Sequence, residues 1–595
     1  MASLPLQAMD LTSLRAVLAE LRPVLLPSRF EKARQADGHT LQVGFRSLTG
    51  RHWLELSWLA EAPRLLAVDA PPRGGDGSTL AQQLQHGLAG LALVGLEQHG
   101  WERVVELQFA TRPGEAIRRS LVVELMGRHS NLFLLDAERR VVAAARQVRE
   151  QQSRLRPIGT GDPYSPPPPL GGMPPSRQES REHWQAQLQL LPLPLGQALR
   201  SAYQGISPAL ALQLAGEDRS SAQALLATGV DQLGLGQWQQ LWQRWQRWLE
   251  TLEEERFVVQ LRGPTPYCCW PAAVDSAGPE AAPPLVGASA ELPINRALAQ
   301  HHHSVLEARQ LQQRRQGLEL KLRQALARES AQRQALQQRL DQVESCEALQ
   351  HQADALLCLL RPSRDEVAEA QSLYKRARKL RRSVAAITPR LAEHDGRISQ
   401  LEASLTYLEQ TEQSCELLQA LEEEGEVLLH ERSQRRRQRR STGNTGNTGN
   451  TGGGAPGSAS APNPLELTSP GGLRLQVGRN HRQNEWISLR QARRGDLWFH
   501  AQECPGSHVV LKSSEGPASE PDLQAAADLA AHFSRARGNS RVAVVMVPSE
   551  ALQRIPGSGP GTVRHRGGEV LWAEPSRAAA LLAPPVHSLG RDPQP

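Results

Sequence analysis

The sequence predicts a multidomain α+β protein in which a long helical hairpin separates compact domains. A chain of 595 residues is too long for a single hydrophobic core. Strand-like alternation of apolar residues occurs toward both ends, whereas helical periodicity fills the middle. A proline-rich stretch at 158–177 and a Gly- and Ser-rich stretch at 441–464 separate these regions.

The N-terminal region predicts an α+β domain rich in antiparallel strands. Leu11–Leu25 has apolar residues at helical spacing, with Asp10 or Thr12 as a possible cap. A second helix is predicted over Gln82–Leu93. Alternation predicts strands at 41–45, 53–56, 65–68, 104–109, 120–124, 131–136 and 141–144.

The next region predicts a small helical domain. Four tryptophans, Trp238, Trp242, Trp245 and Trp248, are spaced to share one broad helix face. A stacking platform for bases is one interpretation, but a tryptophan stripe at helical spacing is more often a packed core face. We therefore predict a core role for these residues. Phe257–Leu261 is predicted to form a strand.

Residues 295–435 predict an antiparallel coiled-coil hairpin. Val305–Leu360 reads as one unbroken helix, and Leu391–Leu418 follows a heptad pattern, with the segment Pro362–Pro389 between them. The segment between the arms carries a dense basic run: Lys375, Arg376, Arg378, Lys379, Arg381 and Arg382. This run lacks acidic partners, so we favour a polyanion contact over an ordinary solvated helix face.

The C-terminal region predicts a second, smaller α+β domain. Strands are expected at 473–477, 486–489, 497–500, 509–511, 542–547 and 570–572, with a helix over 523–536. A disordered tail is expected from about Pro575. The predicted boundaries are 1–160 for the N-terminal domain, 161–182 for the linker, 183–262 for the helical domain, 263–294 for a connection, 295–435 for the hairpin, 436–464 for a basic and Gly-rich linker, 465–575 for the C-terminal domain and 576–595 for the tail.

Composition and motifs limit the function classes. The net charge of +6 is modest, so a polyanion site must come from local clustering. The six cysteines form no CxxC pair, and no secretory signal or long apolar run is present. We therefore expect a reduced, cytoplasmic protein with no membrane partner. No phosphate loop, GxSxG or HExxH motif occurs, which predicts a non-enzyme without catalytic residues, metal or cofactor.

The stretch Gly478–Lys512 predicts a nucleic-acid contact. Its basic residues, Arg479, Arg482, Arg493, Arg494 and Lys512, interleave with Trp486, Trp498 and His500. A tight turn follows at Cys504–His508, where Gly506 permits close backbone approach and Ser507 offers a hydroxyl. Charge, flat side chains and exposed N–H groups together suit structured RNA.

These residues resemble a known family. The pattern GRNxxQN followed by DLWFHxxxxPGSHVV is similar to the C-terminal RNA-binding domain of the NFACT proteins. Residues 100–136 resemble the family's N-terminal domain, which is related in fold to the N-terminal domain of formamidopyrimidine-type DNA glycosylases. GISP at 205–208 is similar to the family's helix-hairpin-helix-like domain, and YKRARKLRRS to its basic coiled-coil tip.

The resemblance implies a role in ribosome quality control. Bacterial members bind large ribosomal subunits obstructed by peptidyl-tRNA, near the stalk base, and recruit alanyl-tRNA for untemplated alanine tailing, which marks the stalled chain for degradation. The implied tRNA contacts are Glu102, where the family has Asp, with Arg103, Glu124, Leu125 and Met126. The implied RNA or ribosome contacts are the six basic tip residues and Arg479, Asn480, Arg482, Gln483, Asn484, Trp498, His500, Gly506, Ser507 and His508. The alternatives are a fibronectin-binding adhesin and a glycosylase-like nucleic-acid enzyme.

Overall fold

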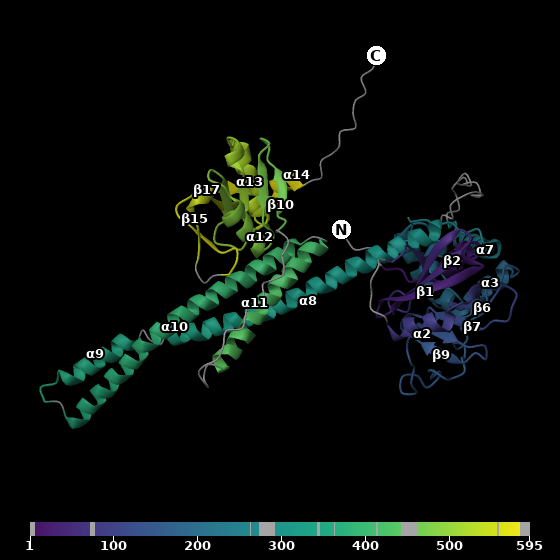
Figure 1. The fold of residues 1–595 in the computed structure, drawn as a ribbon, viewed down its shortest axis with the longest axis horizontal. Coiled ribbons are helices and arrows are strands. Elements are labelled where there is room, and N and C mark those ends of the chain that lie inside the picture. The colour runs from purple at the N-terminus through teal and green to yellow at the C-terminus, as the bar shows by residue number, and fades with distance from the viewer. Residues whose placement is uncertain are drawn as a thin grey trace, which may run out of the picture. The chain divides into compact units, whose positions relative to one another are not determined.

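The computed structural model describes residues 6–71, 78–261, 263–272, 292–341, 345–361, 363–411, 414–441, 462–555 and 559–582, and Figure 1 shows its fold. The chain forms two compact units, Met1–Ala308 and Arg309–Pro595. Between them they hold the antiparallel sheets and long helices of a multidomain α+β protein, which confirms the predicted class at that level. Within the described residues no helix is long and apolar enough to cross a membrane.

The first unit is built on a nine-stranded antiparallel sheet in the order β4-β3-β2-β1-β5-β6-β7-β8-β9. The strands are β1 (Ser28–Asp37), β2 (Thr40–Ser47), β3 (Gly50–Ser57), β4 (Arg64–Val68), β5 (Ala92–Gln98), β6 (Val104–Ala110), β7 (Arg119–Glu124), β8 (Asn131–Leu135) and β9 (Val141–Ala144). A short 3₁₀ turn, η1 (Gly127–His129), joins β7 to β8.

Two helices contribute to the core of this sheet. The helix α1 (Leu11–Leu25) begins at Asp10, whose carboxylate accepts a hydrogen bond from the Ser13 backbone N–H at 2.9 Å. Its apolar stripe is buried among the sheet residues. The helix α2 (Thr79–Leu88) ends five residues before the predicted boundary, because the chain at Ala92 enters β5.

The strands β1 and β5 were not predicted from the sequence. Both strands contain a β-bulge, between Phe30 and Lys32 in β1 and between Leu93 and Gly95 in β5. A bulge adds one residue and so shifts the alternation of apolar and polar side chains. The predicted strand at Phe257–Leu261 is also wrong, since the chain there makes only an isolated bridge between Gln260 and Cys268.

A helical subdomain completes the first unit. Its helices are α3 (Arg181–Leu188), α4 (Leu195–Ala202), α5 (Pro208–Ala215), α6 (Arg219–Ala227) and α7 (Leu235–Glu254). Trp238, Trp245 and Trp248 of α7 are fully buried, and Trp242 packs against the same core. The prediction of a core role for the tryptophan stripe is therefore confirmed.

Long helices dominate the first part of the second unit. They are α8 (Pro293–Asp341), which begins in the first unit, α9 (Ser345–Leu357), α10 (Arg364–Gln410) and α11 (Cys415–Ser441). The single helix predicted over 305–360 is therefore two helices. The helix α10 runs through Pro389, so the proline does not end an arm. Packing of α8, α10 and α11 buries Leu322, Leu401 and Leu418 together. A regular heptad coiled coil stays a prediction.

The C-terminal part of this unit contains a six-stranded sheet in the order β10-β11-β13-β12-β14-β17. The strands are β10 (Leu465–Thr468), β11 (Arg474–Val477), β12 (Leu497–Ala501), β13 (Val509–Leu511), β14 (Val542–Pro548) and β17 (Glu569–Ala573). The helix α13 (Glu520–His532) packs on one face. The opposite face is covered by the π-helical turn η2 (Trp486–Gln491) and by the hairpin β15 (Leu552–Arg554) and β16 (Val563–His565).

Two C-terminal predictions were wrong. Trp486–Leu489, predicted as a strand, lies in η2 and follows the short helix α12 (His481–Glu485). Residues 575–582, predicted as tail, form the 3₁₀ turn η5 (Pro575–Arg577) and the helix α14 (Ala578–Leu582), because Ala578 packs into the sheet core. The remaining tail, 583–595, lies outside the described residues. Two further 3₁₀ turns, η3 (Ser513–Glu515) and η4 (Ser549–Ala551), follow β13 and β14.

Candidate nucleic-acid interface

The predicted tRNA-contacting residues lie together at one edge of the nine-stranded sheet. Glu102 and Arg103 precede β6, and Glu124 ends the neighbouring strand β7, where it pairs with Val104. The Leu125 N–H donates to the Arg103 carbonyl at 2.9 Å. Antiparallel pairing thus brings together residues that are about 20 positions apart in the sequence.

Arg103 and Glu102 are half-buried and face different partners. One guanidinium nitrogen of Arg103, Nη1, donates to the Met9 carbonyl at 3.2 Å, which orients the guanidinium. Glu102 Oε1 accepts a hydrogen bond from the Leu170 N–H at 2.9 Å. Burial raises the pKa of Glu102, against the opposing effects of that N–H and of Arg103. The planar fork of Arg103 leaves further N–H donors for a phosphate or base.

Glu124 is only 1% exposed, and its carboxylate bonds to other side chains inside the protein. Arg156 donates to its two carboxylate oxygens at 2.6 and 2.9 Å, and the Tyr164 hydroxyl donates at 2.9 Å. Although burial opposes it, Glu124 holds the pKa of Arg156 above its ordinary value. Leu125 is also fully buried, so Met126, which is partly exposed, is the residue of this strip that reaches the surface.

Exposed cations beside this strip were missed by the sequence reasoning. Arg128 of η1 is exposed, with its Nε donating to the ring Nε2 of His129 at 3.0 Å, and Arg146 is exposed nearby, where its Nη1 donates to the Arg128 carbonyl at 2.8 Å. The GRH turn directly after the predicted strip was the available signal. Together with Arg103 they give this edge of the sheet a basic rim that suits a phosphate backbone.

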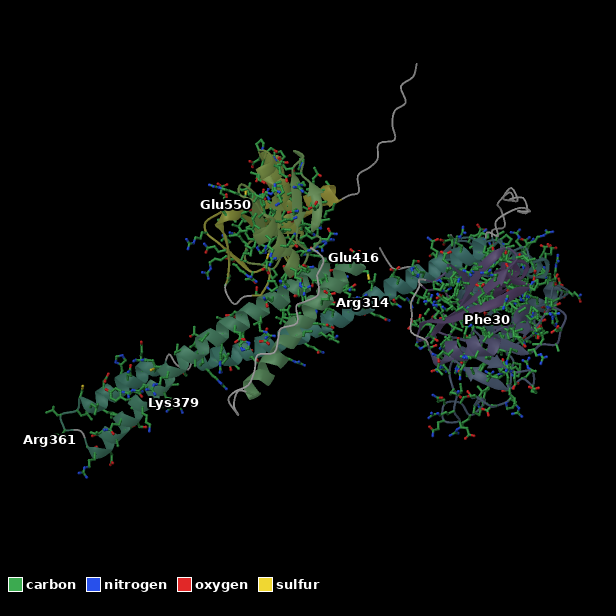
Figure 2. The ribbon with its side chains drawn as sticks, in the orientation of Figure 1. Phe30, Arg314, Arg361, Lys379, Glu416 and Glu550 are labelled. Carbon is green, nitrogen blue, oxygen red and sulfur yellow. The ribbon has the colours of Figure 1, made fainter. Side chains whose placement is uncertain are left out.

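The basic run of α10 is exposed along its whole length. All six cations, Lys375, Arg376, Arg378, Lys379, Arg381 and Arg382, are exposed, and Figure 2 shows Lys379 on this helix. Between them Ala377 is buried against Cys346 of α9, whose Sγ contacts the Ala377 carbonyl at 3.2 Å. Arg381 donates to the Gln350 side chain at 2.7 Å. The segment thus presents cations to solvent while its small residue packs inward.

The RNA-binding signature, Gly478–His508, in contrast contacts α10 and α11 through several of its buried residues. Glu424 of α11 accepts hydrogen bonds from the backbone N–H groups of His481 and Arg482, at 3.1 and 3.0 Å. The His481 ring shares a hydrogen bond of 3.0 Å with Ser404 of α10. These two N–H groups lie at the start of α12, where a carboxylate is favoured.

A second set of contacts joins the signature to Tyr407 of α10. The Asn484 Nδ2 donates to the Tyr407 hydroxyl at 2.8 Å, and its Oδ1 accepts from the His508 N–H at 3.0 Å. The Tyr407 hydroxyl donates to the Gly506 carbonyl at 3.2 Å. A Cβ at residue 506 would lie 2.9 Å from the Ser534 Cβ, so only glycine allows this approach.

Other signature residues also have structural roles. Asn480 caps α12 by accepting from the Gln483 N–H at 2.7 Å, and Gln483 Oε1 accepts from the Arg479 N–H at 2.9 Å. Ser507 is fully buried, so its hydroxyl does not face solvent as the sequence suggested. Trp498 is buried too, stacked on His500 with ring centroids 5.6 Å apart.

Lys512, a predicted cation of the stretch 478–512, and two histidines of the signature offer no charge to a phosphate. Lys512 is 4% exposed and forms an ion pair of 3.0 Å with the buried carboxylate of Asp496. Burial opposes ionisation of Asp496, but hydrogen bonds from Arg493, Ser514 and Lys512 hold its pKa below its ordinary value. Burial lowers the pKa of His500 to about 4 and that of His508 well below its ordinary value, so both rings are neutral at pH 7.

The charges that stay exposed around the signature are arginines. Arg482, Arg493 and Arg494 are exposed, whereas Arg479 is half-buried and burial lowers its pKa. Of the predicted RNA contacts in this stretch, only the arginines therefore offer charge to a ligand.

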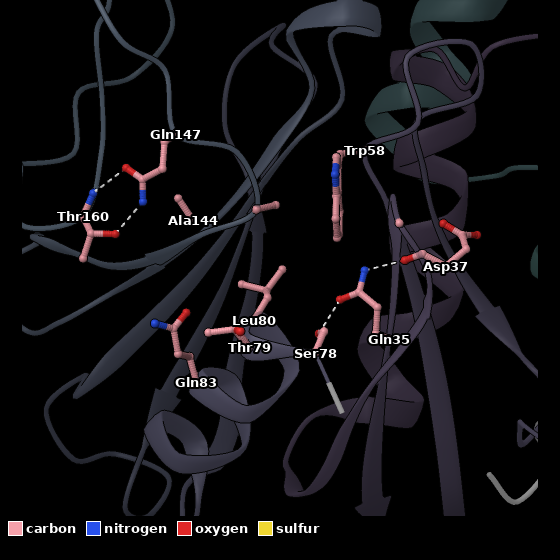
Figure 3. A pocket seen from close by; sticks show the side chains of 12 residues that line it. Gln35, Asp37, Trp58, Ser78, Thr79, Leu80, Gln83, Ala144, Gln147 and Thr160 are labelled. Atoms are coloured by element: carbon pink, nitrogen blue, oxygen red, sulfur yellow. Dashed lines mark hydrogen bonds between the residues drawn. The ribbon is translucent and has the colours of Figure 1, made fainter. Parts of the chain in front are cut away.

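A cavity of about 540 Å³ lies in the first unit, between β1 and the segment after β9 (Figure 3). Its polar side chains already bond to one another: Ser78 donates to Gln35 at 2.7 Å, and Gln147 donates to Thr160 at 2.7 Å. Among its lining residues there is no Lys, Arg or His, so it lacks what a phosphate needs. No cluster of metal-ligating residues occurs in the described parts of the chain.

Family models match both ends of the chain. The model "NFACT N-terminal and middle domains" matches residues 10–368 and 359–442, and the model "NFACT protein RNA binding domain" matches residues 467–567. These matches cover more than half of the chain and include the sheet edge, the basic run of α10 and the signature.

Known proteins are similar to the chain over part of its length or nearly all of it. A protein of Streptococcus suis (strain 05ZYH33) named "Rqc2 homolog RqcH" is 25% identical over 576 residues, 95% of this chain and 97% of its own. The protein of the same name from Bacillus subtilis (strain 168) is 38% identical over 115 residues, 19% of this chain and 20% of its own. The solved C-terminal part of the Streptococcus suis fibronectin/fibrinogen-binding protein is 26% identical with a TM-score of 0.36, over 46% of this chain and 98% of its own.

Proposed function

The chain belongs to the NFACT family, and we propose on that basis that it acts in ribosome quality control. It binds large ribosomal subunits that are obstructed by peptidyl-tRNA, near the stalk base. It recruits alanyl-tRNA there for untemplated alanine tailing of the stalled chain, which marks that chain for degradation. The observation that carries the proposal is the likeness to "Rqc2 homolog RqcH" over 95% of the chain.

Two exposed basic surfaces support an RNA partner of large size. The sheet edge with Arg103, Arg128 and Arg146 belongs to the first unit, and the basic run of α10 belongs to the second. Two separate phosphate-binding surfaces suit a partner that offers both tRNA and ribosomal RNA. In this proposal Arg103 contacts tRNA, and Lys379 with its neighbours contacts the ribosome.

The proposed role needs no catalytic residue in this chain. Peptide-bond formation belongs to the ribosome, so the protein positions tRNA and is not itself an enzyme. Its proposed chemistry is recognition through charge and planar donors, which requires neither a metal nor a cofactor.

Co-sedimentation with large subunits tests the proposal. Purified protein is mixed with large subunits that carry peptidyl-tRNA and, separately, with empty large subunits. We expect the protein to sediment with the first and much less with the second. Failure to sediment with either would refute the proposal, and binding of fibronectin in the same preparation would favour the adhesin.

Substitution of Arg103 tests the role in tRNA binding. Arg103→Ala is expected to reduce alanine tailing by about tenfold or more, since a charge-assisted contact worth about 1.5–3 kcal/mol is lost. Subunit binding should stay within about twofold. The tail is measured by mass spectrometry of the stalled chain in a reconstituted reaction.

Two variants control this experiment. Arg103→Lys keeps the charge but lacks the planar fork, and should recover only part of the activity. Arg112→Ala removes an exposed arginine beyond the other end of β6 and should leave tailing unchanged. Equal loss of subunit binding in Arg103→Ala would argue against a tRNA-specific role.

A further inference from the structure

The edge strand β17 exposes two large apolar side chains on one face of the C-terminal sheet. Trp572 is 63% exposed and Val570 is 47% exposed, whereas Leu571 and Ala573 pack into the core beneath α13. Because side chains alternate along a strand, Trp572 and Val570 share the face that lies opposite α13. A tryptophan this exposed is unusual on a soluble domain and marks a contact surface.

The neighbouring strands continue this face inward, where η2 and the β15–β16 hairpin cover it. Val545 of β14 pairs with Val570 on one side and with His500 of β12 on the other. Ala543 pairs with Trp572, and its carbonyl accepts from the Gln502 N–H at 2.9 Å. The indole of Trp572 therefore stands at the uncovered outer edge of this face, beside the half-buried Ala543.

Exposed cations lie on the chain segment that leads across this face into β17. The segment after β16 crosses it, since a Cβ at residue 568 would lie 2.9 Å from Val545 Cγ2. The His565 ring lies 6.0 Å from that of Trp498, and Arg564 and Arg566 on either side of it are exposed. Within the described chain neither arginine forms an ion pair, so both charges are available to a partner.

We propose that this face, formed by Trp572, Val570 and Arg566, binds unpaired RNA, with a base stacked on the Trp572 indole and a phosphate on Arg566. The assignment rests on the proposed function, because it takes RNA as the partner of the C-terminal domain. It moves the RNA contact away from the signature, whose amide, imidazole and carbonyl groups are bonded to α10 and α11.

Unpaired RNA fits this face better than duplex RNA. A base in a duplex is stacked on its neighbours and cannot cover an indole, whereas an unstacked base can. Stacking does not depend on charge, so it persists at salt concentrations that weaken phosphate contacts. This property separates Trp572 from the basic run of α10, which binds phosphates in any RNA.

Binding of a labelled oligouridine to the full chain tests the proposal. The probe is a fluorescent single strand of about a dozen uridines, compared with a duplex of the same length, across a series of salt concentrations. At the high-salt end Trp572→Ala should weaken single-strand binding by about tenfold, while Trp572→Phe, which keeps a ring, should lose far less. Duplex binding should not change. Arg566→Ala should lower the salt slope by about one.

Two variants serve as matched controls. Leu235→Ala removes an apolar side chain of the first unit that is 82% exposed, and Arg541→Ala removes an exposed arginine of the C-terminal domain that is paired with Glu574. Neither should affect single-strand binding. Photocrosslinking of 5-bromouridine RNA to wild-type protein should in addition label the peptide that contains Trp572, which requires no substitution.

The results separate this proposal from the proposed function. If Trp572→Ala binds the single strand as tightly as wild type at high salt, the RNA assignment is wrong. If Trp572→Ala instead loses co-sedimentation with subunits while it still binds oligouridine, the face is assigned to a ribosomal protein, and the RNA assignment is again wrong. If wild-type protein sediments with subunits but binds no oligouridine, only the RNA assignment of the Trp572 face is refuted. If it binds oligouridine but does not sediment with subunits, only the role in ribosome quality control is refuted.

Discussion

The basic run of α10 and the signature of the C-terminal domain differ in how sequence relates to exposure. The run 375–382 is simple in composition, and its six cations are all exposed. The signature 478–508 is far more specific in sequence, yet Asn480, Gln483, Asn484, Ser507 and His508 are all buried. The signature therefore consists mainly of residues that pack against one another and against α10 and α11. The exposed positions of the basic run need only a positive charge.

The difference has a physical cause. A buried amide or imidazole has few geometries in which all its polar groups are satisfied, so each such position accepts one residue type. An exposed phosphate contact needs only a long cationic side chain within reach. Substitutions in the signature should therefore change stability first, and substitutions in the basic run should change binding alone.

The largest effect on stability is expected at Lys512. Lys512→Met leaves the fully buried Asp496 without its ion-pair partner, which should destabilise the C-terminal sheet by about 3–5 kcal/mol. Hydrogen exchange of β12 and β13 in the full chain measures this loss. Arg482→Met removes an exposed signature cation and should change exchange very little. If both variants changed hydrogen exchange equally, the predicted difference between buried and exposed cations would be wrong.

An intermediate effect is expected from the buried histidines. The pKa of His500 is lowered to about 4 and that of His508 is lowered further, so both bind protons more readily when unfolded. Their contribution to stability is present above about pH 6.5 and falls as the pH drops below it, by about 1.4 kcal/mol per pH unit for each ring.

Hydrogen exchange between pH 7 and pH 5, corrected for the intrinsic rate, measures this slope in β12 and β13. His500→Asn should reduce the change of unfolding free energy with pH by the contribution of one histidine, about 1.4 kcal/mol per pH unit. His565→Asn, at an exposed position of the same domain, should leave it unchanged. A slope that is the same in His500→Asn as in wild type would show that His500 is not buried as a neutral ring.

The smallest effect on stability is expected in the basic run. The triple variant Arg376→Ala, Lys379→Ala and Arg382→Ala should shift the stability of α10 by less than about 0.5 kcal/mol per site, because the side chains are exposed. Its affinity for large subunits should fall, with the salt slope reduced by about three. Titration at several salt concentrations checks both. Unchanged affinity would mean that these cations form an ordinary solvated face.

Regular patterns made much of the fold predictable. The helix α1 was predicted with its bounds and cap, and the strands β2, β6, β7 and β14 follow clear alternation. The sequence failed where the pattern is interrupted: bulges hide β1 and β5, and Trp486–Leu489 alternates like a strand although it forms a π-helical turn. That turn exists because it covers Trp498 and Val545, which is a tertiary requirement.

The site was predictable in its location more than in its contacts. The resemblance brought Arg103 and Met126 to one place, and the structure adds Arg128 and Arg146 beside them. Burial of Glu124 by Arg156 could not be predicted, because the two residues are 32 positions apart and no local pattern links them. The exposure of Trp572 was equally hidden, since a tryptophan in a short strand reads as core.

The continuity of α10 has a consequence for how the second unit engages a partner. The same helix carries Lys379 and, about 25 residues later, the docking residues Ser404 and Tyr407, so the two lie roughly 38 Å apart along one axis. A continuous helix fixes both the distance and the rotation about the helix axis between the cations and the docked domain. When one end is bound, the other is held at high effective concentration over a single place on the partner. An insertion of a few residues near Pro389 would change both this distance and this rotation.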